Sequence, residues 1–365
     1  MRWTLARAGR RLRSVAAAAG ALVLAAGLVW AVGCGSSGPE TTTSGATTST
    51  TSGATTTSAA PAKLSKLTLV APPGPMAIPL AYIAANDKLA DVAEKTEVVV
   101  WQNADQLKAL VAGKQGDFVT IPSNNSAIFY NKGLVLKLLD ISVWNITYLV
   151  TADPDAASFT DIKGRSLAVS LQGSVPDVMF QYIARKEGLD PQKDFKLRYA
   201  TDPTQAAQLL LSGRVDNAVL SEALATAAIL QSKSTDKPLR KALAFDKAWA
   251  QAAGGAALSP IAGTVATASV MDKPGVVAAF RREYKAAVEW MLANPEAAGK
   301  LIETELPELG LKAAVMTASL KSITWKYTPA VEARPSLEAF YQALSELSPE
   351  VIGGRLPDDG FYYTP

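Results

Sequence analysis

The 365-residue sequence predicts an α/β protein whose globular part is divided into two lobes, each a mainly parallel sheet flanked by helices. Two observations support this prediction. Roughly 300 residues follow a low-complexity segment, and at that size a single core stops growing and two lobes are usual. Within them a unit of helix, turn and strand occurs twice, about 100 residues apart, which is too long a spacing for a solenoid.

The two copies of this unit have the same types of residue where their elements begin and end. The first runs from Gln106 to Gly113 and continues from Asp117 to Ser123, and the second runs from Ala206 to Gly213 and continues from Asp216 to Glu222. In each copy, helical apolar spacing ends at a Gly, an Asp opens a short apolar strand, and polar residues follow where a new helix would begin. The repetition favours paired α/β lobes.

The remaining elements follow from apolar runs and their periodicity. Short apolar segments predict strands at residues 67–71, 98–101, 134–139 and 166–170. Helical spacing predicts helices at residues 78–85, 176–186 and 224–231, which alternate with strands as parallel pairing requires. After residue 276 the pattern predicts helices alone, at residues 276–293, 295–305, 312–325 and 336–346, packed on the first lobe.

Residues 1–33 have the pattern of an export signal. Five arginines precede an apolar run from Val15 to Val32, and no acidic residue accompanies them. The sequence Ala31-Val32-Gly33-Cys34 resembles a bacterial lipoprotein signal, although Ala31 stands where that family usually has Leu. The resemblance implies a diacylated Cys34 at the mature N-terminus. The alternative is an uncleaved helix, since 18 apolar residues reach the lower limit for crossing a bilayer; either way, the rest of the chain would be extracytoplasmic.

Residues 34–62 consist almost wholly of Gly, Ser, Thr and Ala, which cannot bury enough apolar surface to fold. We therefore expect a flexible tether between the membrane and the globular part.

Charge and residue usage exclude several classes of function. Five of the 36 Lys and Arg lie in the leader, so 31 remain against 33 Asp and Glu, and we expect no nucleic-acid partner. The chain has no His, and its single Cys is Cys34, which removes imidazole acid/base chemistry, Ser/His/Asp triads and typical zinc sites. We expect no enzymatic activity, cofactor or metal, with a His-independent lyase as the alternative.

Candidate ligand contacts follow the strands, where helix N-termini bring unpaired backbone N–H groups and short polar side chains to one edge of each sheet. In lobe one they are Gly74, Pro75, Met76, Ser123, Asn124 and Asn125, and in lobe two they are Gln172, Gly173, Ser174, Ser221 and Glu222. Plain turn chemistry for the Pro-rich loop, helix capping by Ser123, and a capping pair of Ser174 with Asp177 are the alternatives. Asp177 would also weaken any attraction of anions to that helix.

Glu222 and several aromatic residues indicate the kind of ligand. A carboxylate in a cleft needs a partner, so Glu222 predicts a ligand with N–H donors or a cation, and argues against a simple inorganic oxyanion. The alternative is a first-turn Glu that interacts with the helix dipole. Trp144, Trp249, Phe361 and Tyr362 are candidates for stacking on a ring-shaped solute, or for the core.

Over residues 66–361 the chain resembles the nitrate/sulfonate/taurine-type (NMT1/THI5-like) substrate-binding lipoproteins of ABC importers. The order of several segments carries the resemblance: Lys66 to Pro79, the unit with Gly113 and Asp117, Asp161 to Val169, Gly188 to Pro191, and Asp216 to Ala225. Many relatives have Pro after the Glu, where this chain has Ala223. The resemblance implies a two-lobed type II periplasmic-binding-protein fold, with lobe one at residues 63–150 and 250–365 and lobe two at residues 151–249.

The same resemblance implies a function. We expect a monomeric, lipid-anchored, extracytoplasmic subunit that closes its lobes on a small heteroaromatic, amine-bearing or sulfonate-like solute and delivers it to an ABC permease. Trp144 lies where the family's chain crosses between lobes and is included among the expected contacts. A ligand-sensing subunit of a membrane receptor is the alternative, because binding and closure would look the same.

Overall fold

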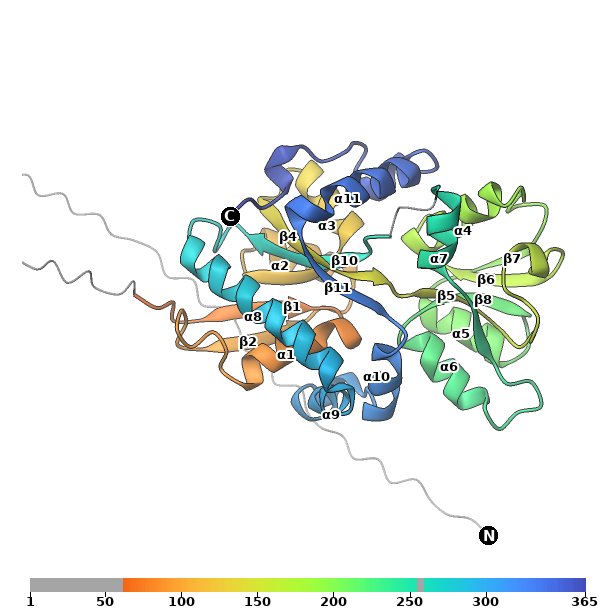
Figure 1. Ribbon diagram of the computed structural model, residues 1–365, viewed down its shortest axis with the longest axis horizontal. Helices are drawn as coiled ribbons and strands as arrows, with labels where there is room; N and C mark the ends of the chain where they lie inside the picture. The colour runs from red at the N-terminus through yellow and green to blue at the C-terminus, as the bar shows by residue number, and fades with distance from the viewer. Residues whose placement is uncertain (1–61, 255–258) are drawn as a thin grey trace, which may run out of the picture. The chain divides into compact units, whose positions relative to one another are not determined.

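A computed structural model describes residues 62–254 and 259–365, which form two lobes, each built on one sheet (Figure 1). We call residues 62–146 and 259–365 lobe one, and residues 147–254 lobe two. The predicted leader, the predicted lipidation site at Cys34 and the tether up to residue 61 lie outside the described residues. Within the described ranges, no helix combines the length and apolar character needed to cross a bilayer.

Lobe one is a six-stranded sheet with helices on both faces. Its strands are β1 (Leu67–Ala71), β2 (Thr96–Val100), β3 (Phe118–Pro122), β4 (Leu136–Asn145), β10 (Ala262–Thr267) and β11 (Thr324–Pro329), in the order β11-β4-β10-β3-β1-β2. Its helices are α1 (Ile78–Ala85), α2 (Ala104–Ala112), α3 (Ser123–Asn131), α8 (Pro274–Ala293), α9 (Pro295–Glu305), α10 (Ala313–Leu320) and α11 (Ala330–Ser345). One apolar core involves α1, α8, α9 and α10, and a second involves α2, α3 and α11.

Lobe two is a smaller, five-stranded sheet. Its strands are β5 (Thr147–Thr151), β6 (Ser166–Ser170), β7 (Lys196–Ala200), β8 (Asn217–Ser221) and β9 (Arg240–Ala244), in the order β7-β6-β8-β5-β9. Its helices are α4 (Val175–Lys186), α5 (Pro203–Leu211), α6 (Leu224–Ser232) and α7 (Phe245–Ala252). The second core of lobe one continues into this lobe, where it includes Phe159, Phe180 and Trp249.

Both sheets are mixed, where the sequence predicted mainly parallel ones. β1 runs parallel to β2 and β3, and β6 runs parallel to β7 and β8. On its other side, β3 pairs with β10, and β8 likewise pairs with β5. Both of these pairings are antiparallel. The reason is the connectivity: β5 and β10 each enter from the other lobe, without the crossover helix that parallel pairing needs.

Most predicted elements are confirmed, but the prediction of helices alone after residue 276 is wrong. The predicted helix at 312–325 ends at Leu320, and β11 follows. Thr324, Trp325, Tyr327 and Thr328 are β-branched or aromatic residues that favour a strand, and β11 pairs with β4. The strand β5 belongs to the second sheet, although the predicted boundary assigned residues 147–150 to lobe one.

The internal repeat is present in three dimensions. β1 begins at Leu67 and β6 at Ser166, an offset of 99 residues, and β3 and β8 begin at Phe118 and Asn217, again 99 apart. The repeated Asp has the same role in both copies: Asp117 Oδ2 accepts a hydrogen bond from Thr68 N at 2.7 Å, and Asp216 Oδ2 accepts one from Ser166 N at 3.1 Å. Each carboxylate ties two neighbouring parallel strands together.

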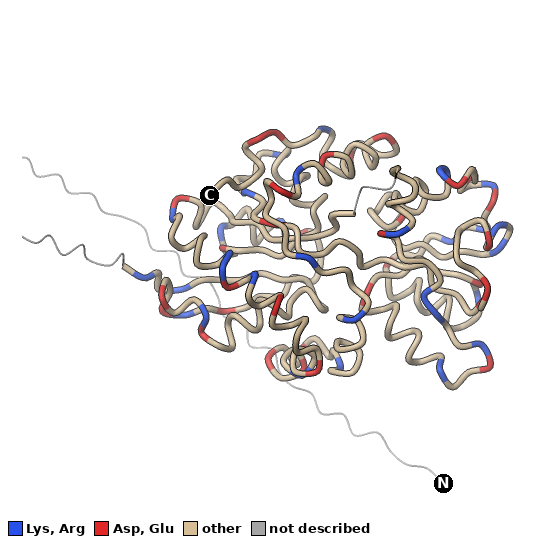
Figure 2. The backbone as a smooth tube through the Cα atoms, viewed as in Figure 1, with Lys and Arg blue, Asp and Glu red and all other residues tan. Residues whose placement is uncertain are grey.

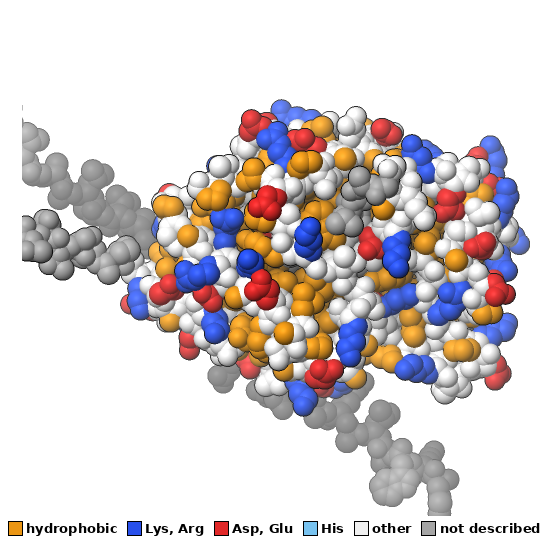
Figure 3. All heavy atoms as spheres, in the orientation of Figure 1, with side chains coloured by type: hydrophobic (Ala, Val, Ile, Leu, Met, Phe, Trp, Pro, Cys, Tyr) orange, Lys and Arg blue, Asp and Glu red, His pale blue; other side chains and the backbone are white. Residues whose placement is uncertain are grey.

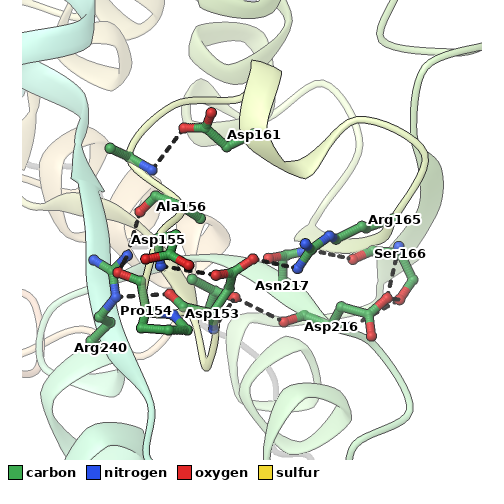
Figure 4. A network of polar contacts seen from close by, with 12 residues as sticks. Asp153, Pro154, Asp155, Ala156, Asp161, Arg165, Ser166, Asp216, Asn217 and Arg240 are labelled. Carbon is green, nitrogen blue, oxygen red and sulfur yellow. Dashed lines mark hydrogen bonds and ion pairs between the residues drawn. The ribbon is translucent and has the colours of Figure 1, made fainter.

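A polar network at the amino ends of β6 and β8 strengthens lobe two (Figure 4). Arg240 donates to the carbonyl oxygens of Asp153 and Pro154 at 2.8 and 2.7 Å, and Arg165 pairs with Asp153 at 2.5 Å. This network fixes the edge of the sheet that lies opposite the strand ends discussed below.

Charged side chains are spread over both lobes. Figure 2 shows Lys and Arg interspersed with Asp and Glu along the chain, and Figure 3 shows the same mixture on the face that it draws. Such a surface has no extended region of one sign on that face, in keeping with the nearly balanced charge of the chain without its leader.

Candidate functional site

The two connections between the lobes lie side by side. The outgoing connection passes from β4 to β5 through Ile146, and the return connection enters β10 through residues 259–261. Ile261 N donates to Val143 O at 2.9 Å, and Ser259 Oγ donates to Trp144 O at 2.9 Å. These bonds make the two connections a paired hinge-like segment.

In lobe one, the end of β3 is bonded to the return connection. Ser123 N donates to Ile261 O at 2.8 Å, and Ser123 Oγ donates to Pro260 O at 2.5 Å. The N-cap position of α3 is Pro122, so the alternative in which Ser123 caps this helix is wrong. Its hydroxyl instead joins two segments that are 137 residues apart in the chain.

The first turn of α3 brings amide side chains to a helix N-terminus. It has no acidic residue and no side-chain cap. Asn124 is buried, and its Nδ2 donates to Val351 O at 3.2 Å and to Asn125 Oδ1 at 3.1 Å. Asn125 is only half-buried, so it has the more accessible amide of the two.

The loop after β1 lies against the connections. Gly74 has φ of 116°, a conformation that favours glycine, and its carbonyl accepts from Ala77 N at 3.0 Å. Met76 packs against an apolar cluster that includes Val143, Ile146 and Ile323. The loop therefore makes an ordinary turn and also brings Met76 beside the outgoing connection.

In lobe two, the loop after β6 is open to solvent. Leu171 is 49% exposed with φ of 53°, and Gln172 and Gly173 are also exposed. The predicted capping pair of Ser174 with Asp177 differs in its bonds, because Ser174 Oγ donates to Ser170 O at 3.0 Å and makes no cap. Asp177 instead accepts from Gly173 N at 2.8 Å. Its carboxylate still supplies negative charge at this helix end, which weakens anion binding there.

The end of β8 is bonded to the outgoing connection. Glu222 N donates to Ile146 O at 2.9 Å, and Ser221 Oγ lies 3.2 Å from Thr147 Oγ1. The Glu222 side chain is fully buried and forms an ion pair with Lys241 of β9. Its Oε2 atom is buried and has no hydrogen-bond partner among the described residues. Lys241 is thus the partner of one Glu222 carboxylate oxygen, Oε1.

Lys241 was not among the residues that the sequence singled out. Its Nζ also donates to Thr226 Oγ1 at 3.0 Å and to Ser322 Oγ at 2.7 Å, and it stands 4.6 Å from the centre of the Tyr148 ring. Burial raises the pKa of Tyr148, and the nearby carboxylates of Glu222 and Asp246 raise this pKa further. A lysine inside the short strand Arg240–Ala244 could have indicated a buried ion pair. Its partners could not be identified from the sequence because they lie far from it along the chain.

The four candidate aromatic residues belong to the core. Trp144 is 2% exposed, and its Nε1 donates to Lys326 O at 2.8 Å. Trp249 is 1% exposed and stacks on Tyr182 with ring centres 4.7 Å apart. Phe361 and Tyr362 are buried against each other, with ring centres 5.1 Å apart. In this arrangement of the lobes, none of the four faces solvent.

Three hollows lie on the surface of lobe one. One of about 440 Å³ lies between α9 and α10, a second of about 380 Å³ is lined by Leu292, Ile323 and Trp325, and a third of about 380 Å³ lies beside Tyr130. None of these three is lined by a predicted contact residue. The ends of β3 and β8 are bonded to the connections through Ser123 and Glu222.

Comparisons with known proteins agree with this fold. The family model described as NMT1/THI5 like matches residues 94–298. No curated protein matches the chain in sequence.

Solved structures with a similar fold include an ABC transporter protein from Parabacteroides distasonis, at 24% identity and a TM-score of 0.67, covering 82% of this chain and 99% of that one. The periplasmic aliphatic sulphonate-binding protein SsuA from Escherichia coli matches at 17% identity and a TM-score of 0.62, covering 82% and 92%. The periplasmic nitrate-binding protein NrtA from Synechocystis matches at 15% identity and a TM-score of 0.56, covering 79% and 84%. This chain therefore has the two-lobed fold of these binding proteins.

Proposed function

The chain belongs to the NMT1/THI5-like family, and from that membership we propose that it is the extracytoplasmic solute-binding subunit of an ABC importer. It captures a small organic solute between its lobes and delivers the solute to a membrane permease. Its residues act by binding and closure, without catalysis, and the absence of His from the sequence supports this part of the proposal.

The observation that carries the proposal is the position of the two equivalent strand ends. The end of β3 is bonded to the return connection through Ser123, and the end of β8 is bonded to the outgoing connection through Glu222. Both carboxyl edges therefore lie next to the segment about which the lobes would rotate. Ligands of α/β sheets bind at such edges, and hinge closure brings the two edges onto one ligand.

The proposed contacts are the predicted residues at or after the ends of β1, β3, β6 and β8 whose side chains do not bond to distant parts of lobe one. In lobe one these are the Gly74–Met76 loop and Asn125, and in lobe two they are Gln172, Gly173, Ser174 and Ser221. The side chains of three other predicted residues donate hydrogen bonds to backbone carbonyl oxygens of lobe one, so we assign them a structural role next to the site: Ser123, Asn124 and Trp144.

Glu222 and Lys241 limit the class of ligand. Because the two charges neutralise each other, the pair offers little attraction to a simple oxyanion, while Glu222 Oε2 is left to accept a hydrogen bond. We propose a neutral or amine-bearing solute with an N–H donor. A sulfonate such as the ligand of SsuA would instead be held by the first turn of α3, which has no acidic residue.

Binding can be tested on freshly purified protein by native mass spectrometry, followed by a thermal-shift panel of amines, pyrimidines and sulfonates and by calorimetry on the ligands that are found. We expect Asn125→Ala in lobe one and Gln172→Ala in lobe two each to weaken binding by about tenfold, the effect of losing one well-formed hydrogen bond. Gln208→Ala, at an exposed position of α5 without side-chain hydrogen bonds, is the matched control.

Two results would count against this proposal. If neither substitution changes the affinity, the strand ends are not the binding site. If only one of them does, the solute binds to a single lobe and closure has no part in its capture.

Membrane attachment through Cys34 is a separate part of the proposal. In the producing cell we expect the wild type in the membrane fraction and Cys34→Ser in the soluble extracytoplasmic or culture fraction, because an export signal followed by a lipidated Cys at the mature N-terminus anchors a protein by its acyl chains. Intact-mass analysis of the wild type should show the added lipid. An unmodified Cys34 in membrane-bound protein would contradict this part of the proposal.

A further inference from the structure

The segment Ser322–Thr324, at the start of β11 in lobe one, makes three polar contacts to lobe two. Ser322 Oγ accepts from Lys241 Nζ at 2.7 Å, and Ser322 O accepts from the hydroxyl of Tyr148. Thr324 Oγ1 donates to Asp246 Oδ2 of α7 at 2.8 Å. Three side chains of lobe two, from β5, β9 and α7, thus bond to two residues of lobe one, Ser322 and Thr324.

Ile323 holds this segment in place. It is 6% exposed and packs in the apolar cluster formed by Val143, Ile146 and Ala262, which lies at the connections. Ser322 and Ile323 lie in the turn after α10, and Thr324 begins β11, so the buried Ile323 stands between the two residues that make the polar contacts. The polar contacts are therefore attached to the hinge of lobe one.

Lys241 joins these contacts to the candidate site. Its side chain is 19% exposed and pairs with the fully buried carboxylate of Glu222, which lies directly after β8. An ammonium group with this little exposure needs polar partners close to it. In this arrangement Lys241 has one partner in lobe two at the proposed ligand edge, and another in lobe one.

The second contact between the lobes has a different character. On the other side of the molecule, Trp249 of α7 meets Phe340 of α11 with ring centres 5.0 Å apart, and α4 also packs on α11. Apolar contacts of this kind are not directional and tolerate small rotations. Hydrogen bonds require defined geometry, so the contacts of Ser322–Thr324 are the ones that distinguish one lobe orientation from another.

We propose that residues Ser322 and Thr324 of lobe one, together with Tyr148, Lys241 and Asp246 of lobe two, form an interlobe latch that favours the arrangement of the lobes described above. Lys241 is its positioning residue: it is held by Glu222 and transmits a change at that carboxylate to Ser322. The proposal goes beyond the proposed function, and only the link to Glu222 as a ligand contact rests on it.

The latch can be tested without knowing the ligand, by measuring the distance between the lobes in the ligand-free protein. In a Cys34→Ser background, spin labels at Lys108→Cys on α2 and Gln208→Cys on α5 place one exposed label on each lobe for electron–electron distance measurements. We expect Lys241→Met and Thr324→Val each to raise the ratio of protein with longer interlobe distances to protein with the distance of this arrangement by about fivefold, the change that loss of one hydrogen bond commonly causes. Lys241→Arg should restore part of the population that has the distance of this arrangement.

The controls remove equivalent groups that do not bridge the lobes. Lys193→Met breaks an exposed pair with Asp190, and Thr235→Val removes a hydroxyl that donates to Ser232 O, both within lobe two. Neither should change the distance distribution. If Lys241→Met fails to fold, the distances in Thr324→Val test the proposal, because this variant does not remove the ion-pair partner of the buried Glu222.

Contacts that stabilise the protein without influencing the arrangement of the lobes would lower the melting temperature of the variants and leave the interlobe distances unchanged, and that result overturns the proposal. Equal shifts in the control variants would overturn it too. Failure of the calorimetric panel to find any ligand would count against the proposed function alone, since the distances are measured without a ligand.

Discussion

The two lobes are built from the same unit, and they differ where that unit ends. In lobe one, β1, β2 and β3 form a parallel set, and β6, β7 and β8 form the same set in lobe two. The helix between the second and third strand of each set is capped alike: Asn103 accepts from Gln106 N at 2.9 Å, and Asp202 accepts from Gln205 N at 2.9 Å. These parts repeat because they determine the fold.

The segments after the third strand do not repeat. After β3 come Ser123, Asn124 and Asn125, which are neutral, whereas after β8 come the charged Glu222 and the apolar Ala223 and Leu224. One edge offers amides, and the other has an ion pair that reaches toward the opposite lobe. In the function and the latch that we propose, both edges contact the solute but only the edge of lobe two couples the lobes, although the scaffold beneath the two edges is shared.

The largest expected effect concerns the apolar cores. Phe180 of lobe two belongs to the core that continues across both lobes, whereas Phe280 of lobe one, stacked on Phe118 at 3.9 Å, belongs to a core whose buried members all lie in lobe one. Replacing either residue by Ala should lower the free energy of unfolding by about 3–5 kcal/mol, because each leaves a cavity. Urea unfolding measures this change.

Hydrogen exchange then separates the two variants. Phe180→Ala should increase exchange in α11 of lobe one as well as in α4, because these helices are in contact. Phe280→Ala should increase exchange in α1 and α8 and leave α4 unchanged. If exchange in Phe180→Ala rises in lobe two only, the shared core does not couple the lobes.

The second prediction concerns pH, and it applies to lobe one. Asp140 of β4 is fully buried, with Thr264, Ser142, Tyr284, Tyr327 and Arg281 around it, and burial raises its pKa from 3.8 to about 7. A raised pKa in the folded state means that stability is greatest below pH 4 for this group and is lost as pH rises toward 7. The shift corresponds to on the order of 4 kcal/mol at most.

Between pH 5 and pH 8, the free energy of unfolding of Asp140→Asn should therefore change little on account of this position. That of the wild type should fall as the pH rises. Urea midpoints at the two pH values measure the difference. Asp236→Asn, in an exposed loop of lobe two, is the control and should follow the wild type. Identical pH dependence in Asp140→Asn and the wild type would show that Asp140 does not titrate in this range.

The sequence predicted the scaffold well because its signals are local. Apolar periodicity, the Gly after each repeated helix and the Asp before each third strand were enough to locate β1, β6, α1 and α9 at their observed bounds. β11 was missed because Lys312 to Trp325 has no breaker between α10 and the strand, and the pairing with β4 that decides its conformation involves residues about 180 positions away.

The candidate site was less predictable for the same reason. The sequence identified Glu222 as a carboxylate in need of a partner, but Lys241 reaches it through the strand order β8-β5-β9, which no local pattern specifies. Ser322 comes from the other lobe. Trp144 and Ser123 were predicted as contacts from their position, but their hydrogen bonds to Lys326 and Pro260 depend on tertiary structure.

The smallest expected effect tests the repeated Asp itself. Asp117→Ala removes the acceptor of the buried Thr68 N–H and of Ser269 Oγ, which lies 2.5 Å away, so we expect a loss of about 2 kcal/mol in the free energy of unfolding. Asp216 is exposed, and water can replace it at Ser166, so Asp216→Ala should cost less than about 1 kcal/mol. Asp117→Asn, which keeps one acceptor oxygen, should recover part of the loss. Urea unfolding of the wild type and the three variants measures these free energies. Equal losses in Asp117→Ala and Asp216→Ala would mean that burial does not make the two repeated Asp residues differ in their contribution to stability.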